Sequence, residues 1–447
     1  MKLSVSVPND WIPERKYILD FVFSSFLGIQ YDFMNSEELP YYRICFEDKT
    51  ILITDSFFSA IKESSTYLSD NFLPHVQLSE FPFSVEKDLV ILYGENTSES
   101  SKDTIKCGVD IFASIFFMLT RWEEYVVNER DGHNRFPASA SIAFKHHFLH
   151  RPIVNEYIEM LWKMMVTLGY DGNRKKRQFQ IVPTHDIDHF RMSNRIRHLT
   201  KAIVKNLLHR KSFSFQAYLK AYFKDPYDTL DFLLKTSEKA GLKSHFYLMS
   251  VHARTEILSP SDWLQYKDFS ETFKHYAERG HVVGFHPGYF TYNDGAQFHK
   301  EKVMLEQTLG MHINEGRHHY LMMKIPDTLQ MWDEEGMNID STLSYADAEG
   351  FRCGTGDEFY YFDFLQRRQL NIKERPLIIM DGTLLTYRKY DLKKAEQVIT
   401  YYKEIGKKYQ MPITILFHNS VFFDRKGLKD LYQRVMADYI HKIEMLK

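Results

Sequence analysis

The sequence contains 447 residues, of which 44% are hydrophobic, 26% are charged and 15% are aromatic, and its formal net charge is −2 at pH 7. This length predicts two or three domains with sizeable cores, and the near-neutral charge argues against a nucleic acid partner. The three cysteines are widely spaced and fit neither a disulfide framework nor a cysteine-based zinc site. We find no signal-peptide pattern and no apolar run long enough to span a bilayer, so we expect a cytoplasmic protein.

Residues 1–172 are predicted to form a smaller α+β domain, because short alternating runs such as "RICFEDKTILITD" precede two segments with helical periodicity, 110–127 and 151–169. Within the first segment, "RWEEY" at 121–125 predicts an exposed helix face with salt bridges. The polar, basic stretch "YDGNRKKRQ" is typical of a linker, which predicts a domain boundary at 171–178. The sequence indicates neither a role for this domain nor an oligomeric state.

Residues 178–447 have a different pattern, in which short apolar runs alternate with amphipathic helical segments. Such alternation predicts repeated βα units around a parallel sheet or barrel. The seven runs are "FQIVPTHDID", "SHFYLMSV", "HVVGFHPGY", "GRHHYL", "NIDSTL", "PLIIMDGTL" and "ITILFHN". The stretch at about 191–225 is too long for a βα loop and predicts a helical insertion. Its basic segment 194–212 fits either a solvated helix face or a peripheral membrane contact.

Ionisable side chains collect at the C-terminal ends of five of these runs. They are Asp186, Asp188, His286, Arg317, His319, Asp381 and His418. In a βα barrel the strand ends share one face, so residues distant in sequence meet there. Asp186 and Asp188 are two positions apart and can face the same side of a strand, where two like charges need a cation or a proton between them. A divalent metal with histidine ligands would satisfy this need; the alternative is that these residues only hydrogen-bond strand ends and loop amides.

Two of these runs resemble motifs of the polysaccharide deacetylase family, also called the NodB-homology family of carbohydrate esterases. "THDID" resembles its D-x-D motif, and this implies Asp186 as the catalytic base and Asp188 as a metal ligand. "GHVVGFHPGY" is similar to a Gly-His-x-x-Gly-x-His pattern, which implies His286 as a histidine ligand. The resemblance covers residues 178–447 and implies a distorted seven-stranded (β/α) barrel of the polysaccharide deacetylase type, in a subgroup that carries an extra N-terminal domain.

Three further segments extend the resemblance. "GRHHY" is similar to the family's motif of an arginine followed by an aromatic residue, which implies that Arg317 orients the base. "ITILFHN" resembles the last motif, in which a strand ends in Leu-x-His, and it implies His418 as the general acid. A weaker fourth motif implies that Asp340 and Asp381 supply polar groups that bind the substrate.

The sequence departs from the family at one position. The usual second histidine ligand lies four residues after the first, and Phe290 occupies that position. Either another residue replaces the missing ligand or the site works without a metal. His319 is our first candidate for the replacement and His189 the second, whereas strand alternation turns His185 away from the aspartates.

The resemblance implies a metal-dependent hydrolase that removes an acyl group, here an N-acetyl group, from a sugar or glycan intermediate, with a divalent metal such as Zn²⁺. Tyr289, Tyr320 and Tyr345 are candidates for stacking on the sugar. Two alternatives remain open: a metal-independent amidase that acts on a non-peptide C–N bond in the same fold, and a catalytically inactive glycan-binding relative. The metal-free alternative is favoured by Phe290.

Overall fold

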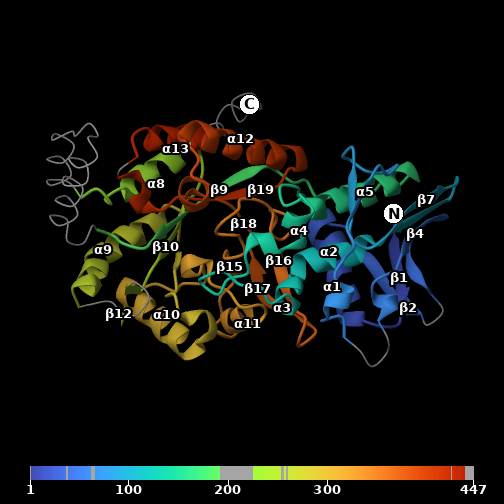
Figure 1. Ribbon diagram of the computed structural model, residues 1–447, viewed down its shortest axis with the longest axis horizontal. Coiled ribbons are helices and arrows are strands. Elements are labelled where there is room, and N and C mark those ends of the chain that lie inside the picture. The colour runs from blue at the N-terminus through green and yellow to red at the C-terminus, as the bar shows by residue number, and fades with distance from the viewer. Residues whose placement is uncertain are drawn as a thin grey trace. The chain divides into compact units, whose positions relative to one another are not determined.

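The computed structural model describes residues 2–36, 39–61, 66–191, 225–252, 256–257, 260–423 and 425–437 (Figure 1). The basic segment 194–212, and nearly all of the predicted helical insertion around it, lie outside these residues. The chain divides into two compact units. Unit 1 contains Met1–Phe179, Leu321–Ile378 and Ile405–Pro412, and unit 2 contains Gln180–Tyr320, Ile379–Glu404 and Ile413–Lys447. Among the described residues, no helix is both long and apolar enough to cross a membrane.

The main sheet of unit 1 has six strands. Their spatial order is β2 (Tyr31–Ser36), β1 (Leu3–Pro8), β3 (Tyr41–Phe46), β4 (Lys49–Thr54), β8 (Thr104–Val109) and β7 (Gly94–Ser100). The sheet is mixed, because β1 is parallel to β2 but antiparallel to β3. In β3, buried side chains alternate with less buried ones, as expected of a strand with one face on the core. Two short strands, β5 (Gln77–Ser79) and β6 (Leu89–Ile91), pair separately.

The main N-terminal helices of unit 1 are α1 (Ile12–Leu19), α2 (Ile111–Thr120) and α5 (Ile153–Thr167), and α2 contacts both others. Every residue of α2 is buried, because its sequence is apolar on all sides. Asp110 caps this helix by accepting a hydrogen bond from the Ala113 backbone N–H at 3.0 Å. The other helical segments are η1 (Asp20–Leu27), η2 (Phe58–Ala60), η3 (Asp70–Phe72), α3 (Glu123–Val126), η4 (Ala138–Ala140) and α4 (Ile142–Lys145).

The later segment of the chain adds one helix and three strands to unit 1. They are α11 (Asp327–Glu334), β15 (Ile339–Asp340), β16 (Phe359–Asp363) and β17 (Arg368–Glu374). β17 pairs in parallel with β15 and antiparallel with β16. This part of the chain therefore joins the compact unit that contains the N-terminal region.

The segment 121–125 differs from the prediction. Arg121 is fully buried, and its Nε and Nη2 atoms donate hydrogen bonds to Glu124 Oε1 and Glu123 Oε2, both at 2.9 Å. Arg352 also pairs with the Glu124 carboxylate. The prediction of an exposed helix face is wrong, because these charges neutralise one another inside the unit instead of facing water.

Unit 2 contains strands that deliver the predicted site. Their spatial order is β14 (Glu315–Gly316), β13 (Val282–Phe285), β10 (His245–Leu248), β9 (Gln180–Ile187) and β19 (Pro412–Leu416), with β18 (Leu377–Met380) next to β19. The pairs β9–β10, β10–β13 and β13–β14 are parallel. Every residue of β9 after Gln180 is buried, which is typical of a parallel strand covered on both faces.

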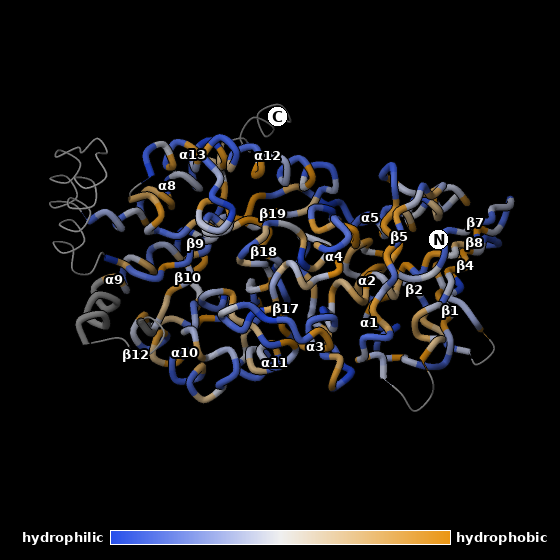
Figure 2. The backbone as a smooth tube through the Cα atoms, in the orientation of Figure 1, coloured by the Kyte–Doolittle hydropathy of each residue, from blue (hydrophilic) through white to orange (hydrophobic). Residues whose placement is uncertain are grey.

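Helices flank these strands. Figure 1 shows α8 (Leu230–Lys239) and α13 (Leu428–Ala437) on one side, and α9 (Pro260–Glu278) and α10 (Gly295–Leu309) on the other. In α13 the buried residues Leu428, Leu431, Tyr432, Val435 and Met436 follow helical spacing, and Figure 2 shows hydrophilic residues between them. The remaining elements are β11 (Val251–His252), β12 (Glu256–Ile257), η5 (Thr291–Asn293), η6 (His319–Leu321), η7 (Thr383–Tyr387), α12 (Leu392–Tyr409) and η8 (Asn419–Phe422).

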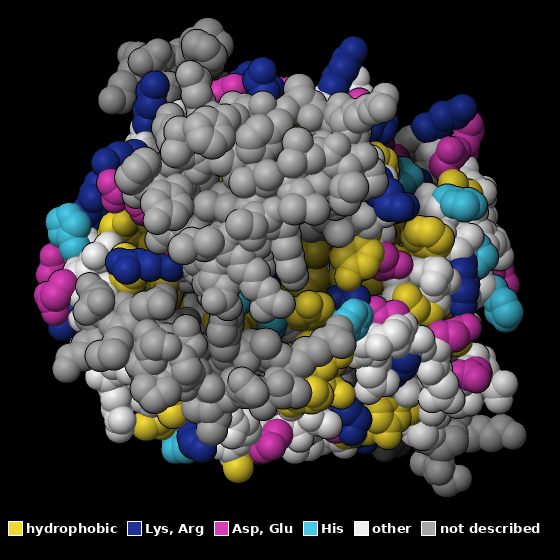
Figure 3. Space-filling model, turned by 60° about the vertical axis from the view of Figure 1, so that its left-hand side comes forward, with side chains coloured by type: hydrophobic (Ala, Val, Ile, Leu, Met, Phe, Trp, Pro, Cys, Tyr) yellow, Lys and Arg dark blue, Asp and Glu magenta, His cyan; other side chains and the backbone are white. Residues whose placement is uncertain are grey.

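The mixed α/β fold expected from the sequence is confirmed. Six of the seven predicted runs contain most or all of a strand, namely β9, β10, β13, β15, β18 and β19, whereas "GRHHYL" shares only Gly316 with β14. Closure of seven strands into a barrel, and the division into domains at 1–172 and 178–447, stay predictions. On the coloured part of the face in Figure 3, acidic and basic side chains are interspersed. The absence of a nucleic acid partner also stays a prediction.

Candidate metal and catalytic site

The two aspartates come from the end of β9. Asp186 is almost fully buried, and Asp188 lies just past the strand with 24% of its side chain exposed. His286 Nε2 lies 3.9 Å from Asp186 Oδ2 and 3.3 Å from Asp188 Oδ1, so both carboxylates approach the same imidazole. Ile187, between them, is buried. The alternation of a strand thus brings two carboxylates to one histidine.

His286 follows the last residue of β13, and its two ring nitrogens have different surroundings. Nδ1 lies 2.6 Å from the Arg317 carbonyl oxygen. Because a carbonyl oxygen can only accept, Nδ1 carries a proton and donates it to this oxygen, so in a neutral ring the lone pair would be on Nε2. That lone pair faces an oxygen of Asp188, and two acceptors repel unless a cation or a proton lies between them.

His319 completes a cluster with Asp188 and His286. One ligand atom from each of the three residues lies within 4.8 Å of those of the other two. The ring centroids of His286 and His319 are 5.1 Å apart. Burial lowers the pKa of His319 to about 3, so this ring is neutral at pH 7 and its nitrogens can act as ligands.

Three buried atoms of this cluster have no hydrogen-bond partner within the described part of the chain. They are Asp188 Oδ1, His286 Nε2 and His319 Nδ1. Burial opposes the charge of Asp188, but the histidines, above all His286, hold its pKa well below its usual range. An ionised carboxylate with two imidazole nitrogens is a donor set that suits zinc and similar divalent ions.

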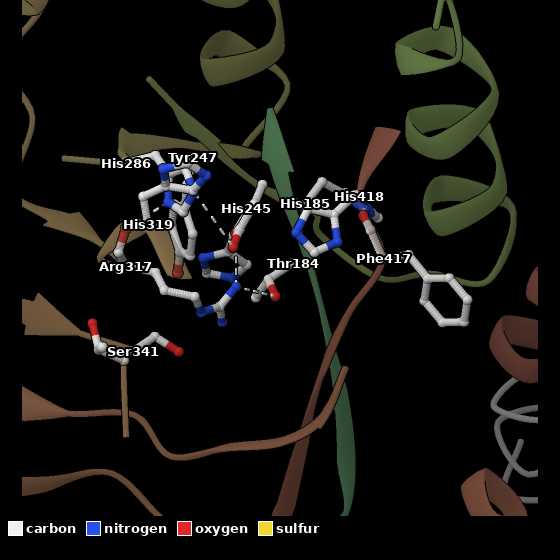
Figure 4. A network of polar contacts seen from close by, with 12 residues as sticks. Thr184, His185, His245, Tyr247, His286, Arg317, His319, Ser341, Phe417 and His418 are labelled. Carbon is white, nitrogen blue, oxygen red and sulfur yellow. Dashed lines mark hydrogen bonds and ion pairs between the residues drawn. The ribbon is translucent and has the colours of Figure 1, made fainter. Parts of the chain in front are cut away.

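Arg317 follows β14 and holds Asp186. The guanidinium is fully buried, and its Nη1 donates to Asp186 Oδ1 at 2.8 Å and to Thr184 Oγ1 at 3.0 Å (Figure 4). The Thr184 hydroxyl in turn donates to the Ile415 carbonyl at 3.2 Å. A charge-assisted bond of this length fixes the orientation of the carboxylate.

His418 follows β19 and pairs with Asp381, which follows β18. Its Nδ1 lies 2.7 Å from Asp381 Oδ1, and its backbone N–H donates to Asp381 Oδ2 at 3.0 Å. Burial opposes a charge on the ring, but attraction to Asp381, with help from Asp188 and Asp186, raises the pKa of His418 to about 10. At neutral pH the ring is therefore protonated on both nitrogens. Asp381 contacts the proton on Nδ1, and the second proton is on Nε2.

Three other histidines near these strands lie outside this cluster. His185 contacts the Phe417 carbonyl through Nδ1 at 2.9 Å and Tyr432 through Nε2 at 3.2 Å. His318 is buried, with Nε2 3.0 Å from Thr291 Oγ1. His189, our second candidate for the missing ligand, stacks on Tyr227. Among the described residues, the only group that could hold a metal contains none of these three.

Two of the predicted substrate-binding tyrosines lie beside the cluster. The ring of Tyr320 is 4.6 Å from that of His319 between centroids, and the ring of Tyr289 is 5.4 Å from that of Tyr320. Tyr320 is 40% exposed and has a φ of 60°, a conformation that a tyrosine rarely adopts. Phe290, in contact with Tyr289, is 55% exposed.

Asp340 and Tyr345 belong to unit 1, where both are buried. The Asp340 carboxylate accepts a hydrogen bond from the Thr342 hydroxyl at 2.5 Å, and the Tyr345 hydroxyl accepts one from Arg121 at 3.0 Å. In this structure the two side chains offer no exposed surface to a sugar. Their role in substrate binding stays a prediction.

Sequence reasoning missed several contacts of the site. It did not predict that both carboxylate oxygens of Asp381 contact His418, and the role of Asp381 in substrate binding stays a prediction. It also passed over Thr184 and Tyr247, which contact Arg317, and Glu315, which accepts a hydrogen bond from Tyr247. The alternation within "HFYL" could have predicted that Tyr247 faces the same side as His245, but nothing in the sequence pairs Tyr247 with Arg317.

Comparisons with known proteins give one family and a set of distant structures. A model described as "Family of unknown function (DUF7033)" matches residues 3–169. A polysaccharide deacetylase from Mycobacterium smegmatis is similar at 14% identity with a TM-score of 0.39, covering 59% of this chain and 84% of that one. A family 4 carbohydrate esterase from Streptomyces lividans has 9% identity and a TM-score of 0.30, covering 60% and 90%. A family 4 pseudoenzyme from Bacillus anthracis has 8% identity and a TM-score of 0.29, covering 58% and 62%. No curated protein matches the sequence significantly.

Proposed function

We propose that this protein is a metal-dependent hydrolase that removes an acyl group, specifically an N-acetyl group, from a sugar or glycan intermediate. The observation that carries this proposal is the arrangement of acceptor atoms on Asp188, His286 and His319, which face one another without a hydrogen-bond partner among the described residues. A candidate base, Asp186, lies on one side of this arrangement. The positive charge of the protonated His418 helps to lower the pKa of Asp188, and His418 is the candidate acid.

A divalent ion fits the donor set of these three residues, because one ionised carboxylate and two neutral imidazoles match the ligands that zinc prefers. When bound, such an ion supplies Lewis-acid polarisation of the acyl carbonyl and makes water more acidic. Phe290 has no ligand atom, and His319, on a different loop, supplies the second imidazole in its place. Zinc is the metal that we propose.

Asp186 is the proposed general base. Its Oδ1 is occupied by Arg317, so Oδ2, on the side of His286, accepts the proton of the attacking water. His418 is the proposed general acid. Its Nδ1 is held by Asp381, so Nε2 donates its proton to the leaving amine as the C–N bond breaks. The products are a carboxylic acid and a free amine.

The substrate that we propose is an N-acylated sugar or a sugar-containing precursor in the cytoplasm. Tyr320 offers an exposed ring next to His319, and such rings combine an apolar face with a polar hydroxyl, as a sugar requires. Tyr289 supports it from the side. A peripheral membrane contact through residues 194–212 is a separate proposal, and it would suit a lipid-linked substrate.

A metal-independent amidase is the second candidate, and Phe290 is the observation that favours it. The pairs Asp186–Arg317 and His418–Asp381 would then act alone on an activated C–N bond. Turnover that resists a chelator would distinguish this candidate from the first. Binding of a glycan without any turnover of acylated probes would instead support an inactive relative.

The deciding experiment is metal analysis of untagged protein purified without chelators, by plasma mass spectrometry. We expect about one zinc per chain in the wild type, and loss of it in Asp188→Ala, His286→Ala and His319→Ala. His189→Ala is the matched control, because it removes an imidazole outside the cluster and should keep the metal. A wild type that takes up no divalent ion after reconstitution would contradict the metal-dependent proposal.

A further inference from the structure

The peptide group between Phe417 and His418 is held at both of its edges. Its N–H, which belongs to His418, donates to Asp381 Oδ2 at 3.0 Å. Its carbonyl oxygen, which belongs to Phe417, lies 2.9 Å from His185 Nδ1 (Figure 4). A peptide group is planar, so hydrogen bonds at opposite edges fix the rotation of the whole plane. This plane sets the direction in which the chain enters His418, and therefore the position from which its imidazole extends.

His185 makes this contact from β9, the strand that also carries Asp186. Consecutive side chains of a strand point to opposite faces, so the His185 imidazole lies on the face away from the Asp186 carboxylate. β9 and β19 are neighbours in the sheet, and the Phe417 N–H donates to the Thr184 carbonyl at 3.1 Å. His185 thus links the residue next to the proposed base with the residue next to the proposed acid.

The contacts of His185 fix its protonation and its orientation. A carbonyl oxygen can only accept, so Nδ1 carries a proton and donates it to the Phe417 oxygen. Burial lowers the pKa of His185 to about 3, so the ring is neutral at pH 7 and Nε2 is an acceptor. The Tyr432 hydroxyl, 3.2 Å away, donates to Nε2. The ring cannot turn over without breaking both of these bonds.

Two serines hold Tyr432 in turn. Tyr432 lies on α13, and its oxygen is 3.4 Å from the hydroxyl of Ser237 on α8. Because the Tyr432 proton is used toward His185, Ser237 is the donor in this contact. Ser244, ahead of β10, donates to Ser237 at 2.7 Å. All four side chains are fully buried, so water does not compete for these hydrogen bonds.

We propose that His185 is a positioning residue that clamps the Phe417–His418 peptide group and so fixes the acid His418 relative to the base Asp186. The consequence for the reaction rests on the proposed function, because it requires these two residues to transfer protons. The positional consequence does not, since the hydrogen bonds of His185 involve no group of a substrate.

Crystal structures of His185→Leu and His185→Asn test the positioning without any need for turnover. Leucine has no donor, so the Phe417 carbonyl should turn away from β9, and His418 should move relative to Asp186 by about 1 Å, a displacement that matters for catalysis. Asparagine carries an N–H donor as many bonds from the backbone as Nδ1 and should keep the carbonyl in place. An unmoved His418 in His185→Leu overturns the proposal, whether or not the wild type turns over a substrate.

Steady-state kinetics of the full, zinc-loaded chain with an N-acetylated chito-oligosaccharide test the effect on the reaction. His185→Leu should lower kcat about 10- to 100-fold with KM and zinc content unchanged, and His185→Asn should keep most of the wild-type rate. In a His418→Ala background, His185→Leu should have no further effect, because His185 acts through His418. Equal losses in both backgrounds, or a loss of zinc that matches the loss of rate, overturn the proposal. A wild type without turnover defeats only the proposed function, and the crystal structures then decide the positioning.

His281→Leu is the matched control. His281 is also a buried histidine of unit 2, and its ring nitrogens contact the Ser244 N–H at 2.9 Å and Glu238 Oε1 at 3.2 Å. It precedes β13, at the opposite end of that strand from His286. Its loss should lower the free energy of unfolding and leave kcat unchanged. A loss of kcat as large as that of His185→Leu would indicate a general packing defect and contradict the proposal.

A second variant keeps the proposal testable if His185→Leu fails to fold. Combining it with Tyr432→Phe removes the hydroxyl that His185→Leu leaves buried without its acceptor, which is the costly part of the substitution. We expect kcat of this double variant to fall about 10- to 100-fold as well. An unchanged kcat contradicts the proposal.

Discussion

Each unit contains a buried cluster of ionisable side chains, and the two clusters are satisfied in different ways. In unit 1, Arg121 and Arg352 face Glu123 and Glu124, so every carboxylate there meets a guanidinium. In unit 2, Asp188, His286 and His319 turn acceptor atoms toward one another. The first arrangement is neutral as it stands. The second leaves acceptor atoms that a proton, or a cation from outside the chain, would satisfy, and this difference distinguishes a structural charge cluster from a candidate binding site.

The largest effect expected from breaking the unit 2 arrangement is loss of the metal. His319→Ala removes one of the three proposed ligands. It should lower zinc affinity by more than about 100-fold, because mutation of residues that only support a ligand already costs up to about 100-fold in metal affinity. Zinc added to the chelated wild type should raise its Tm, whereas His319→Ala should not respond. Equal zinc affinities by competition with a chromogenic chelator would contradict the role of His319.

Removal of a proton-transfer group should come next. Asp186→Asn keeps the shape of the side chain but cannot accept a proton, and His418→Ala removes the acid. We expect each to lower kcat about 10²- to 10⁴-fold on an N-acetylated chito-oligosaccharide. Zinc content measured in parallel should stay at the wild-type level, and a drop in zinc that matches the drop in rate would assign these residues to metal binding instead.

The unit 1 cluster should respond through stability. Glu124→Gln leaves Arg352 without its buried countercharge and Arg121 with Glu123 alone, and it should reduce the free energy of unfolding by about 3–5 kcal/mol in urea titrations. Asp231→Asn breaks an exposed ion pair with Lys235 in unit 2 and should change it by less than about 1 kcal/mol. If both variants lose equally little, the unit 1 cluster is not a source of stability.

A pH profile should show the smallest effect. With a pKa of about 10, His418 keeps the proton that the acid must donate throughout the neutral range, and it loses that proton as pH rises through 10. The rate should therefore stay level from pH 7 to 9 and fall above 10. Asp381→Asn removes the main attraction and should move this fall to lower pH. An unmoved basic limb in that variant would show that another group is responsible.

The free energy of unfolding should change with pH in the same direction as the rate, falling as the pH rises. The folded pKa of His418 lies above its ordinary value of 6.5, so its contribution is fully present below pH 6.5 and is lost as pH rises from there toward 10. Thermal unfolding across this range, compared with Asp381→Asn, measures it. The wild type should lose stability over this window by more than the variant does.

The sequence by itself determined the elements that carry the site. Runs of apolar residues predicted the strands, and spacing by two residues placed Asp186 and Asp188 together at the end of β9. It also placed Arg317 and His418 at strand ends. These features are local, because a strand needs only its own periodicity to fix which side chains share a face.

Only the tertiary structure decided which of these side chains meet. His319 lies beside His286 because β13 and β14 pair, and Asp381 contacts His418 because β18 and β19 are neighbours. Tyr247 reaches Arg317 across strands for the same reason. The burial of Arg121 and its glutamates could not be read from helical spacing, since their partner Arg352 follows more than 200 residues later in the chain. Contacts between distant segments depend on strand register and packing, which no local pattern encodes.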